Sequence, residues 1–199
     1  MELTNKEKKH LQSVSRLLAK VLRHTPDELG VTLDAHGWVS VPTLLKALDE
    51  KGRKISLEGL YWIVETSSKK RFTLAPDGQR IRAAQGHSIN VDLTLRAITP
   101  PDFLFHGTAA HNIDAIRNQG LIAGQRQHVH LSANRATATQ VGARHGAPVV
   151  LTIDTSAMIT VGLAFYQADN GVWLTDHIAP HFINFGDAHA SIDPSSNNE

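Results

Sequence analysis

The C-terminal half of the chain is defined by Phe103-Leu-Phe-His106-Gly107-Thr108 and, further along, by His128-Val-His130-Leu-Ser132. In both stretches apolar residues flank or alternate with a histidine, which is typical of a strand with one buried face. Pro148–Ile153 is a third strand-like run. A domain of short strands and helices is therefore expected to begin after the double proline at 100–101.

Turn and cap residues place the other elements of this domain. Short helices are expected over Asn112–Asn118 and Ala136–Arg144, ending at Gly120 and Gly146. A hairpin is expected over Phe165–Leu174.

The first 85 residues show a different order of elements. The apolar spacing from Leu11 predicts a helix that ends near His24, before Thr25-Pro26. Gly30–Val39 is interpreted as strand-turn-strand, and a helix should follow at Pro42. Ser56 is expected to cap another helix, and a hairpin should turn at Pro76-Asp-Gly78. In the two later helices the expected inward residues are Leu44, Leu45 and Leu48, then Leu57, Leu60, Tyr61 and Val64.

Helices closed by a hairpin indicate a winged-helix-like lobe, and the fold class is predicted to be α+β. The predicted divisions are a lobe over 1–85, a linker over 86–100, a second lobe over 101–190 and a disordered tail over 191–199.

The amino-acid composition excludes several kinds of site and several classes of protein. The chain has 199 residues, 41% of them hydrophobic, and no cysteine, which excludes disulfide frameworks, thiolate nucleophiles and cysteine-based zinc sites. No apolar run approaches the ~20 residues of a membrane span, and the N-terminus lacks the apolar core of a secretion signal. A cytoplasmic protein that does not bind membranes is therefore expected. The chain is also expected to be a monomer.

Charge is distributed unevenly along the chain. Residues 1–82 hold 15 Lys and Arg against 10 Asp and Glu, whereas residues 83–199 hold 5 Arg against 9 acidic residues. The basic first part suits a polyanionic partner, although lysine-rich solvated surfaces have the same composition.

Three arginines and a histidine stand out as candidate anion ligands. Arg23 and His24 are adjacent at a helix end, where basic residues are also favoured by the helix dipole alone. Arg71 opens a strand, and Arg126 lies in the loop before the second histidine motif. Converging guanidinium groups bind phosphate bidentately and stay charged at working pH.

The histidine motifs allow two interpretations. His128 and His130 share a strand face, and with His106 they could form a zinc site. Alternatively, His106-Gly107-Thr108 brings backbone and a side chain against a flat polar ring such as nicotinamide, with His130 and Ser132 facing the same cleft. The second interpretation is preferred, and no metal is expected. Histidines buried for structural reasons are the alternative for either motif alone.

Taken together, the motifs of the chain resemble those of the RNA 2′-phosphotransferase (KptA-type) family, the NAD-dependent enzymes of tRNA splicing. The resemblance spans about residues 11–186 and keeps the family's order. It is carried by Ser15–His24, Lys70–Phe72, Ile81–Ser88, Phe105–Thr108, Gly120–Gly124, Arg126 with His128–Ser132, Gly142–Gly146 and Asn170–Trp173.

The resemblance implies an N-terminal winged-helix-like lobe, an ADP-ribosyltransferase-like NAD-binding lobe and an active site between them. It implies catalytic roles for Arg23, His24, Arg71 and Arg126. The NAD-contacting residues would be His106, Gly107, Thr108, His130 and Ser132, and the RNA-facing ones Arg82, Gln85, His87 and Ser88.

The chemistry implied by the resemblance has two steps. An internal RNA 2′-phosphate attacks C1″ of the NAD ribose and expels nicotinamide, and ribose O2″ then attacks that phosphate. The products are 2′-hydroxyl RNA and ADP-ribose 1″,2″-cyclic phosphate, with NAD consumed as a co-substrate.

Two other functions compete. One is ADP-ribosyl transfer to terminal phosphates of RNA or DNA. Transfer to proteins or bases is disfavoured, because many such enzymes use a glutamate and the chain has none between Glu65 and Glu199. The other is a winged-helix regulator that senses a nucleotide, although the helix after Ser56 lacks the Arg and Lys of a recognition helix.

Overall fold

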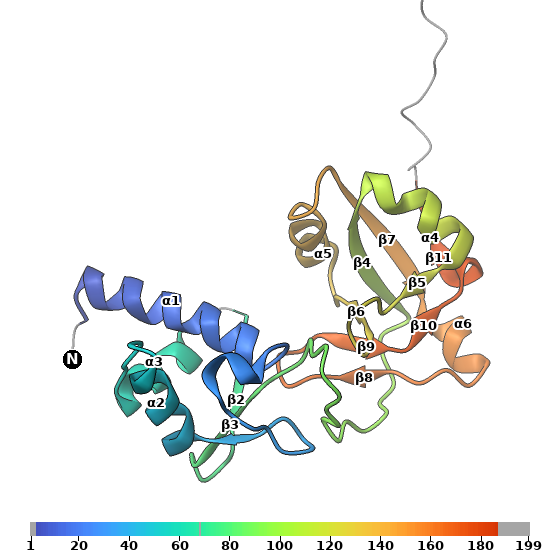
Figure 1. The fold of residues 1–199 in the computed structure, drawn as a ribbon. Coiled ribbons are helices and arrows are strands. Elements are labelled where there is room, and N and C mark those ends of the chain that lie inside the picture. The colour runs from blue at the N-terminus through green and yellow to red at the C-terminus, as the bar shows by residue number, and fades with distance from the viewer. Residues whose placement is uncertain (1–2, 68, 187–199) are drawn as a thin grey trace, which may run out of the picture. The chain divides into compact units, whose positions relative to one another are not determined.

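Two separate hydrophobic cores organise the chain in the computed structural model, which describes residues 3–67 and 69–186 (Figure 1). Unit 1 comprises Met1–Leu95, Gln125–Gln127 and Ala168–Gly171, and unit 2 comprises the remainder. The main division, at Leu95, falls inside the 86–100 segment expected to link two lobes. The tail expected over 191–199 lies outside the described residues.

Three α-helices form most of the core of unit 1. The first begins with a capping box, in which the Thr4 hydroxyl accepts from the Glu7 amide while the Glu7 carboxylate accepts from the Thr4 amide. Ser40 and Ser56 cap the other two helices, as expected for Ser56. The bounds are α1 (Asn5–Val21), η1 (Pro26–Leu29), α2 (Val41–Glu50) and α3 (Leu57–Glu65).

A three-stranded antiparallel sheet completes unit 1 in the order β1-β3-β2. The predicted hairpin is confirmed as β2 (Phe72–Leu74) and β3 (Arg80–Ala83). The strand-turn-strand interpretation of Gly30–Val39 was wrong, because only β1 (Val39–Ser40), at its end, pairs in a ladder, with β3. Asp34 instead organises this loop, its carboxylate accepting from the amides of His36 and Trp38.

One core assignment in α3 was also wrong. Leu57 was expected to face inward but is 39% exposed, whereas Ile63 is buried beside Leu60. Leu57 is the first residue of the helix, so no preceding turn covers it, and the buried stripe runs through positions three apart.

Unit 2 is built from small antiparallel sheets. The longest ladder joins β4 (Phe103–Ala109) to β7 (Pro148–Asp154), which confirms two predicted strands. The predicted helices are observed as α4 (Ile113–Gln119), which ends at Gly120 as predicted, and α5 (Arg135–Gly142). The predicted end of the second helix at Gly146 was wrong, because α5 ends at Gly142 with Ala143 as its C-cap. The remaining elements are η2 (Ala110–Asn112), β5 (Leu121–Ile122), β6 (Val129–Leu131), α6 (Thr155–Thr160), β8 (Tyr166–Gln167), β9 (Trp173–Thr175), β10 (His177–Ile178), η3 (Pro180–Phe182) and β11 (Ile183–Asn184).

The α+β prediction is confirmed at the level of a mixed protein with six α-helices and antiparallel sheets among the described residues. Helix α6 and strands β5, β10 and β11 were not predicted, since runs of two to six residues carry little periodicity. Within the described part of the chain, no helix is both long and apolar enough to cross a membrane.

Close contact between α5 and β4 depends on a glycine. A Cβ atom on Gly107 would lie 1.7 Å from the carbonyl oxygen of Ala138, and one on Gly142 would lie 2.6 Å from that of Thr108. Side chains alternate along a strand, so Gly107 faces α5 while its neighbours His106 and Thr108 face the other side.

Gly107→Ala should therefore destabilise unit 2 by at least about 3 kcal/mol, because backbone rather than a flexible side chain occupies the space that a methyl group needs. The measurement is the free energy of unfolding by urea, followed by tryptophan fluorescence. Gly162→Ala is the control, because it has open space and only the cost of a positive φ, about 1–2 kcal/mol. Equal losses in the two variants would contradict the packing role of Gly107.

Candidate active site

The candidate site in unit 1 starts at the turn that closes α1. The amides of Arg23 and His24 both donate to the carbonyl of Lys20, at 3.3 and 2.9 Å, so the two residues lie in a hydrogen-bonded turn directly after the helix. The helix end was predicted to within a few residues of Val21. The C-terminal end of a helix carries partial negative charge, which favours cations at this position.

Arg71 reaches this region from the position directly before β2. Its backbone amide and its guanidinium Nη1 both lie 3.3 Å from the Ser67 hydroxyl, and its carbonyl accepts from the Ala84 amide. The Ser67 hydroxyl therefore orients the guanidinium, while the Ala84 amide fixes the backbone of Arg71 beside β3.

Arg126 joins the same unit from a distant part of the sequence, since Gln125–Gln127 packs with unit 1. The pKa of Arg23 is lowered to about 10, first by burial and then by the positive charges of Arg71 and Arg126. The guanidinium groups of Arg71 and Arg126 therefore lie close enough to Arg23 to repel its charge, and Arg23 remains protonated at neutral pH.

Arg23 and Arg71 form no ion pair with the described residues, and the buried Nε of Arg23 has no hydrogen-bond partner among them. A buried cation without a counter-ion is unfavourable, and an anion bound here would relieve both the repulsion and the missing hydrogen bond. This arrangement fits a phosphate group, which accepts from several guanidinium groups at once.

His24 is oriented by a residue from the segment after β3. Its Nδ1 lies 2.8 Å from the Ser88 hydroxyl. The pKa of His24 is lowered, first by loss of hydration and then by the charges of Arg23 and Arg126. The imidazole is therefore neutral at pH 7, with Nε2 available for a ligand.

The segment Gln85–Ser88 lies directly against Arg23. The Ser88 amide donates to the Arg23 carbonyl at 3.0 Å, and a Cβ on Gly86 would be 3.8 Å from the Arg23 side chain. Gly86 has φ of 89°, which other residues rarely adopt.

His87, between these two contacts, is only 2% exposed, and neither ring nitrogen has a hydrogen-bond partner among the described residues. Burial lowers the pKa of His87 to about 4, and the neighbouring charges of Arg23, Arg82 and His24 act in the same direction. A neutral, buried imidazole thus lies close to the Arg23 side chain of the arginine cluster.

Arg82 occupies a different environment, although it lies on the neighbouring strand β3. It is 9% exposed, its guanidinium carbon lies 4.5 Å from the centre of the Trp38 ring, and its Nη2 lies 3.4 Å from the Asp169 carboxylate. The Thr73 hydroxyl donates to the same carboxylate oxygen at 2.7 Å. Unlike Arg23, Arg82 has both a counter-ion and an aromatic partner.

The two histidine motifs lie side by side in unit 2. The amide and carbonyl of Phe105 exchange hydrogen bonds with those of Ser132, at 2.9 and 2.8 Å, and the Nδ1 of His106 lies 3.0 Å from the His130 carbonyl. Thr108 lies two residues further along β4, and its hydroxyl accepts a hydrogen bond from the Asn112 side-chain amide. Half-buried His106, His130 and Ser132 therefore form one polar surface with defined donors and acceptors.

No group of three or more His, Asp or Glu side chains able to hold a metal ion occurs among the described residues. His128 instead contacts Asp176 at 3.7 Å and the Tyr166 ring.

Comparison with known proteins shows which family the chain belongs to. Residues 8–177 match the model of the family described as RNA 2′-phosphotransferase, Tpt1 / KptA family. The chain belongs to the RNA 2′-phosphotransferase family. It is 47% identical over 178 residues to the "RNA 2′-phosphotransferase" of Escherichia coli strain K12, covering 89% of this chain and 97% of that protein. It is 49% identical over 179 residues to the "Probable RNA 2′-phosphotransferase" of Hahella chejuensis, covering 90% and 96%.

In this member of the RNA 2′-phosphotransferase family, the four residues expected to be catalytic, Arg23, His24, Arg71 and Arg126, all fall in unit 1. The five expected to contact NAD fall in unit 2. Of the four expected to face RNA, Gln85 is half-buried and Ser88 exposed, whereas Arg82 and His87 are buried. Sequence reasoning did not find the pairing of Asp169 with Arg82, because the two are 87 positions apart.

The buried His87 predicts a measurable pH dependence of stability. Its pKa is about 4 in the folded protein and about 6.5 in the unfolded chain, so the unfolded state binds the proton more readily. Stability is therefore retained above pH 6.5 and falls as pH drops toward 4, by up to roughly 3 kcal/mol from this residue.

His87→Leu should flatten that part of the profile, as measured by urea unfolding at pH 7.0, 5.5 and 4.5. His36→Leu is a control histidine in a turn of the same unit. An unchanged slope in His87→Leu would show that His87 titrates normally.

Proposed function

We propose that this chain transfers an internal 2′-phosphate of RNA to the ADP-ribose portion of NAD. The products would be 2′-hydroxyl RNA, nicotinamide and ADP-ribose 1″,2″-cyclic phosphate. Family membership supports this reaction. The structural observation that carries it is the cluster of Arg23, Arg71 and Arg126, in which the partly buried charge of Arg23 lies near two further guanidinium groups, as in a phosphate site.

The arginine cluster suits a phosphate that is both nucleophile and electrophile. A phosphate dianion needs no base to become a nucleophile, so its attack demands positioning and partial neutralisation. When the same phosphorus is attacked in turn, negative charge grows on its equatorial oxygens. Guanidinium groups already in place stabilise that charge without reorganisation.

His24 is proposed to act on the ribose hydroxyl. A neutral imidazole can accept a proton at Nε2 when Nδ1 carries the hydrogen and donates a hydrogen bond to the Ser88 hydroxyl. The lowered pKa keeps this form populated at neutral pH. In this proposal Ser88 positions His24, in addition to its expected contact with RNA.

NAD is proposed to bind unit 2 through His106, Thr108, His130 and Ser132. The half-burial of His106, His130 and Ser132 and the adjacency of the two motifs suit a ligand with a flat polar ring and ribose hydroxyls, whereas Thr108 is buried. Gly107 would contribute indirectly, by allowing α5 to support β4. No metal is required, because the charges to be neutralised are met by arginines.

The finer fold assignment belongs to the same proposal. The order α1, β1, α2, α3, β2, β3 suits a winged-helix-like lobe, and the short antiparallel sheets of unit 2 suit an ADP-ribosyltransferase-like lobe. We propose that the protein is a cytoplasmic monomer acting on RNA.

The deciding experiment is turnover of a short RNA with one internal 2′-phosphate, with and without NAD. The expected result is NAD-dependent loss of the phosphate with release of one nicotinamide per RNA. A matched RNA with only a terminal phosphate tests the competing ADP-ribosyl transfer. Modification of that RNA alone would replace the proposed function, and binding without turnover of either would favour the regulator.

Arg126→Ala should lower kcat by a factor on the order of 10²–10³, because one charge-stabilising contact to the phosphate is lost. The measurement is single-turnover release of nicotinamide with saturating RNA. Arg96→Ala, at an exposed arginine of unit 2, is the matched control and should retain activity. An unfolded Arg126→Ala protein, judged by circular dichroism, would make the residue structural instead.

Ser88→Ala should lower kcat roughly 10-fold, part of the 10²–10⁴ that acid-base catalysis commonly contributes. The KM for NAD should not change. The variant should also alter the acidic limb of the pH profile of kcat, since the partner of His24 Nδ1 is removed. Ser88→Thr, which keeps the hydroxyl, should restore activity; if it does not, the hydroxyl is not what matters.

A further inference from the structure

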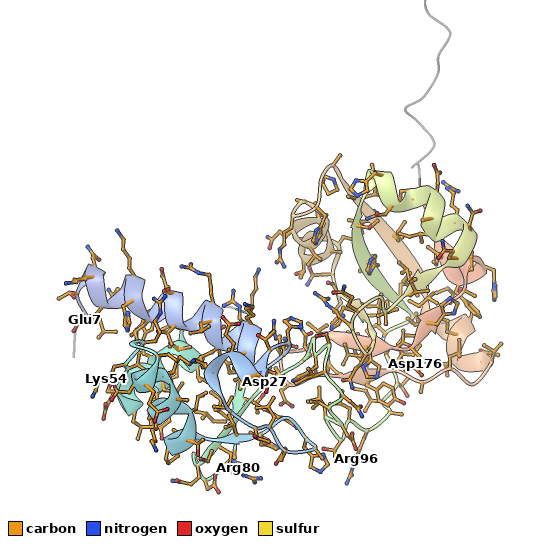
Figure 2. All side chains as sticks on the ribbon, in the orientation of Figure 1. Glu7, Asp27, Lys54, Arg80, Arg96 and Asp176 are labelled. Atoms are coloured by element: carbon orange, nitrogen blue, oxygen red, sulfur yellow. The ribbon has the colours of Figure 1, made fainter. Side chains whose placement is uncertain are left out.

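The outward face of α1 carries a row of four basic side chains and two uncharged polar ones. Leu11, Val14, Leu18 and Val21 mark the buried face of the helix. On the opposite face, at spacings of three and four residues, lie Lys6, Lys9, Gln12, Ser13, Arg16 and Lys20. Figure 2 shows nitrogen-tipped side chains along the side of α1 that is turned away from α2 and α3.

Most of these cations are not neutralised within the protein. Lys6, Lys9 and Arg16 are exposed and form no ion pair with the described residues, whereas Lys20 pairs with Glu28 at 2.6 Å. The one acidic residue of α1, Glu7, is engaged in the capping box at its first turn. Between its first turn and Lys20, the outward face of α1 therefore carries positive charge and no acidic side chain of the helix.

The row ends at the candidate phosphate site. It runs about 21 Å from Lys6 to Lys20, at ~1.5 Å per residue, and Arg23 follows in the next turn. A stacked nucleic acid strand carries one phosphate per ~3.4 Å, so this length corresponds to roughly six nucleotides.

We propose that the outward face of α1 binds the phosphodiester backbone of the same RNA whose 2′-phosphate is held by Arg23. This inference rests on the proposed function and extends it from a single phosphate to a stretch of RNA. Unpaired cations such as Lys6, Lys9 and Arg16 suit a backbone contact that is independent of sequence. The surface would then make the enzyme prefer a 2′-phosphate within a longer RNA.

The test uses a variant with Lys6→Gln, Lys9→Gln and Arg16→Gln, since glutamine is nearly as good a helix former as lysine or arginine. The substrates are a ten-nucleotide RNA and a trinucleotide, each with one internal 2′-phosphate. Binding without NAD is measured by anisotropy over a range of salt concentrations, and turnover is measured as kcat/KM.

For the ten-nucleotide RNA, the slope of log Kd against log salt should fall by about 2, and kcat/KM at low salt should fall roughly 10-fold. For the trinucleotide, kcat/KM should change less than about 2-fold, because Arg23, Arg71 and Arg126 are intact.

The matched control is Lys46→Gln, Lys51→Gln and Arg53→Gln, which removes three exposed cations from unit 1 outside α1. It should leave the salt slope unchanged. Equal losses in the two triple variants would overturn the proposal and reduce the effect to net charge. An unchanged slope in the α1 variant would also overturn it.

A failure of the proposed function would give a different experimental result from a failure of the inference about α1. The wild-type protein would then turn over neither RNA, and the binding arm would still decide whether α1 contacts the backbone.

Discussion

Repulsion among three guanidinium groups is the constraint on which the candidate site depends. Arg23, Arg71 and Arg126 lie close enough to lower the pKa of Arg23, which is already disfavoured by burial. The negative end of the α1 dipole offsets part of this cost, but the buried Nε of Arg23 keeps no partner among the described residues. The free energy of folding gained elsewhere in unit 1 must therefore offset the cost of this cluster, which is suited to binding an anion.

Two features of unit 1 hold the cluster in place. The segment Gln85–Ser88 binds the turn after α1 through the backbone of Arg23 and the ring of His24, and it buries a neutral histidine rather than another cation. Arg82, on the adjacent strand, is neutralised by Asp169 and covered by Trp38. Arg23 and Arg82 thus have different environments, because Arg82 has a carboxylate partner and Arg23 forms no ion pair with the described residues.

In unit 2, the close packing of backbone segments positions the polar groups of the candidate site. Gly107 and Gly142 allow α5 to approach β4, and the pairing of Phe105 with Ser132 brings the two histidine motifs together. Each motif by itself is short and could belong to an ordinary core. Their shared polar surface on the side of β4 opposite α5 is what makes them a candidate site for NAD.

The sequence by itself determined the family, the main helices and strands and the candidate residues, because caps, turns and periodicity act over a few neighbouring positions. Ser56 and the hairpin around Pro76 are examples, whereas Leu57 and the very short strands β5, β10 and β11 show where local signals fail. Only the tertiary structure decided which arginine is paired and which is not, and why residue 107 is a glycine. Those answers depend on contacts such as Arg82 with Asp169 and Gly107 with Ala138, between residues far apart in the chain, whose proximity arises only when the cores pack.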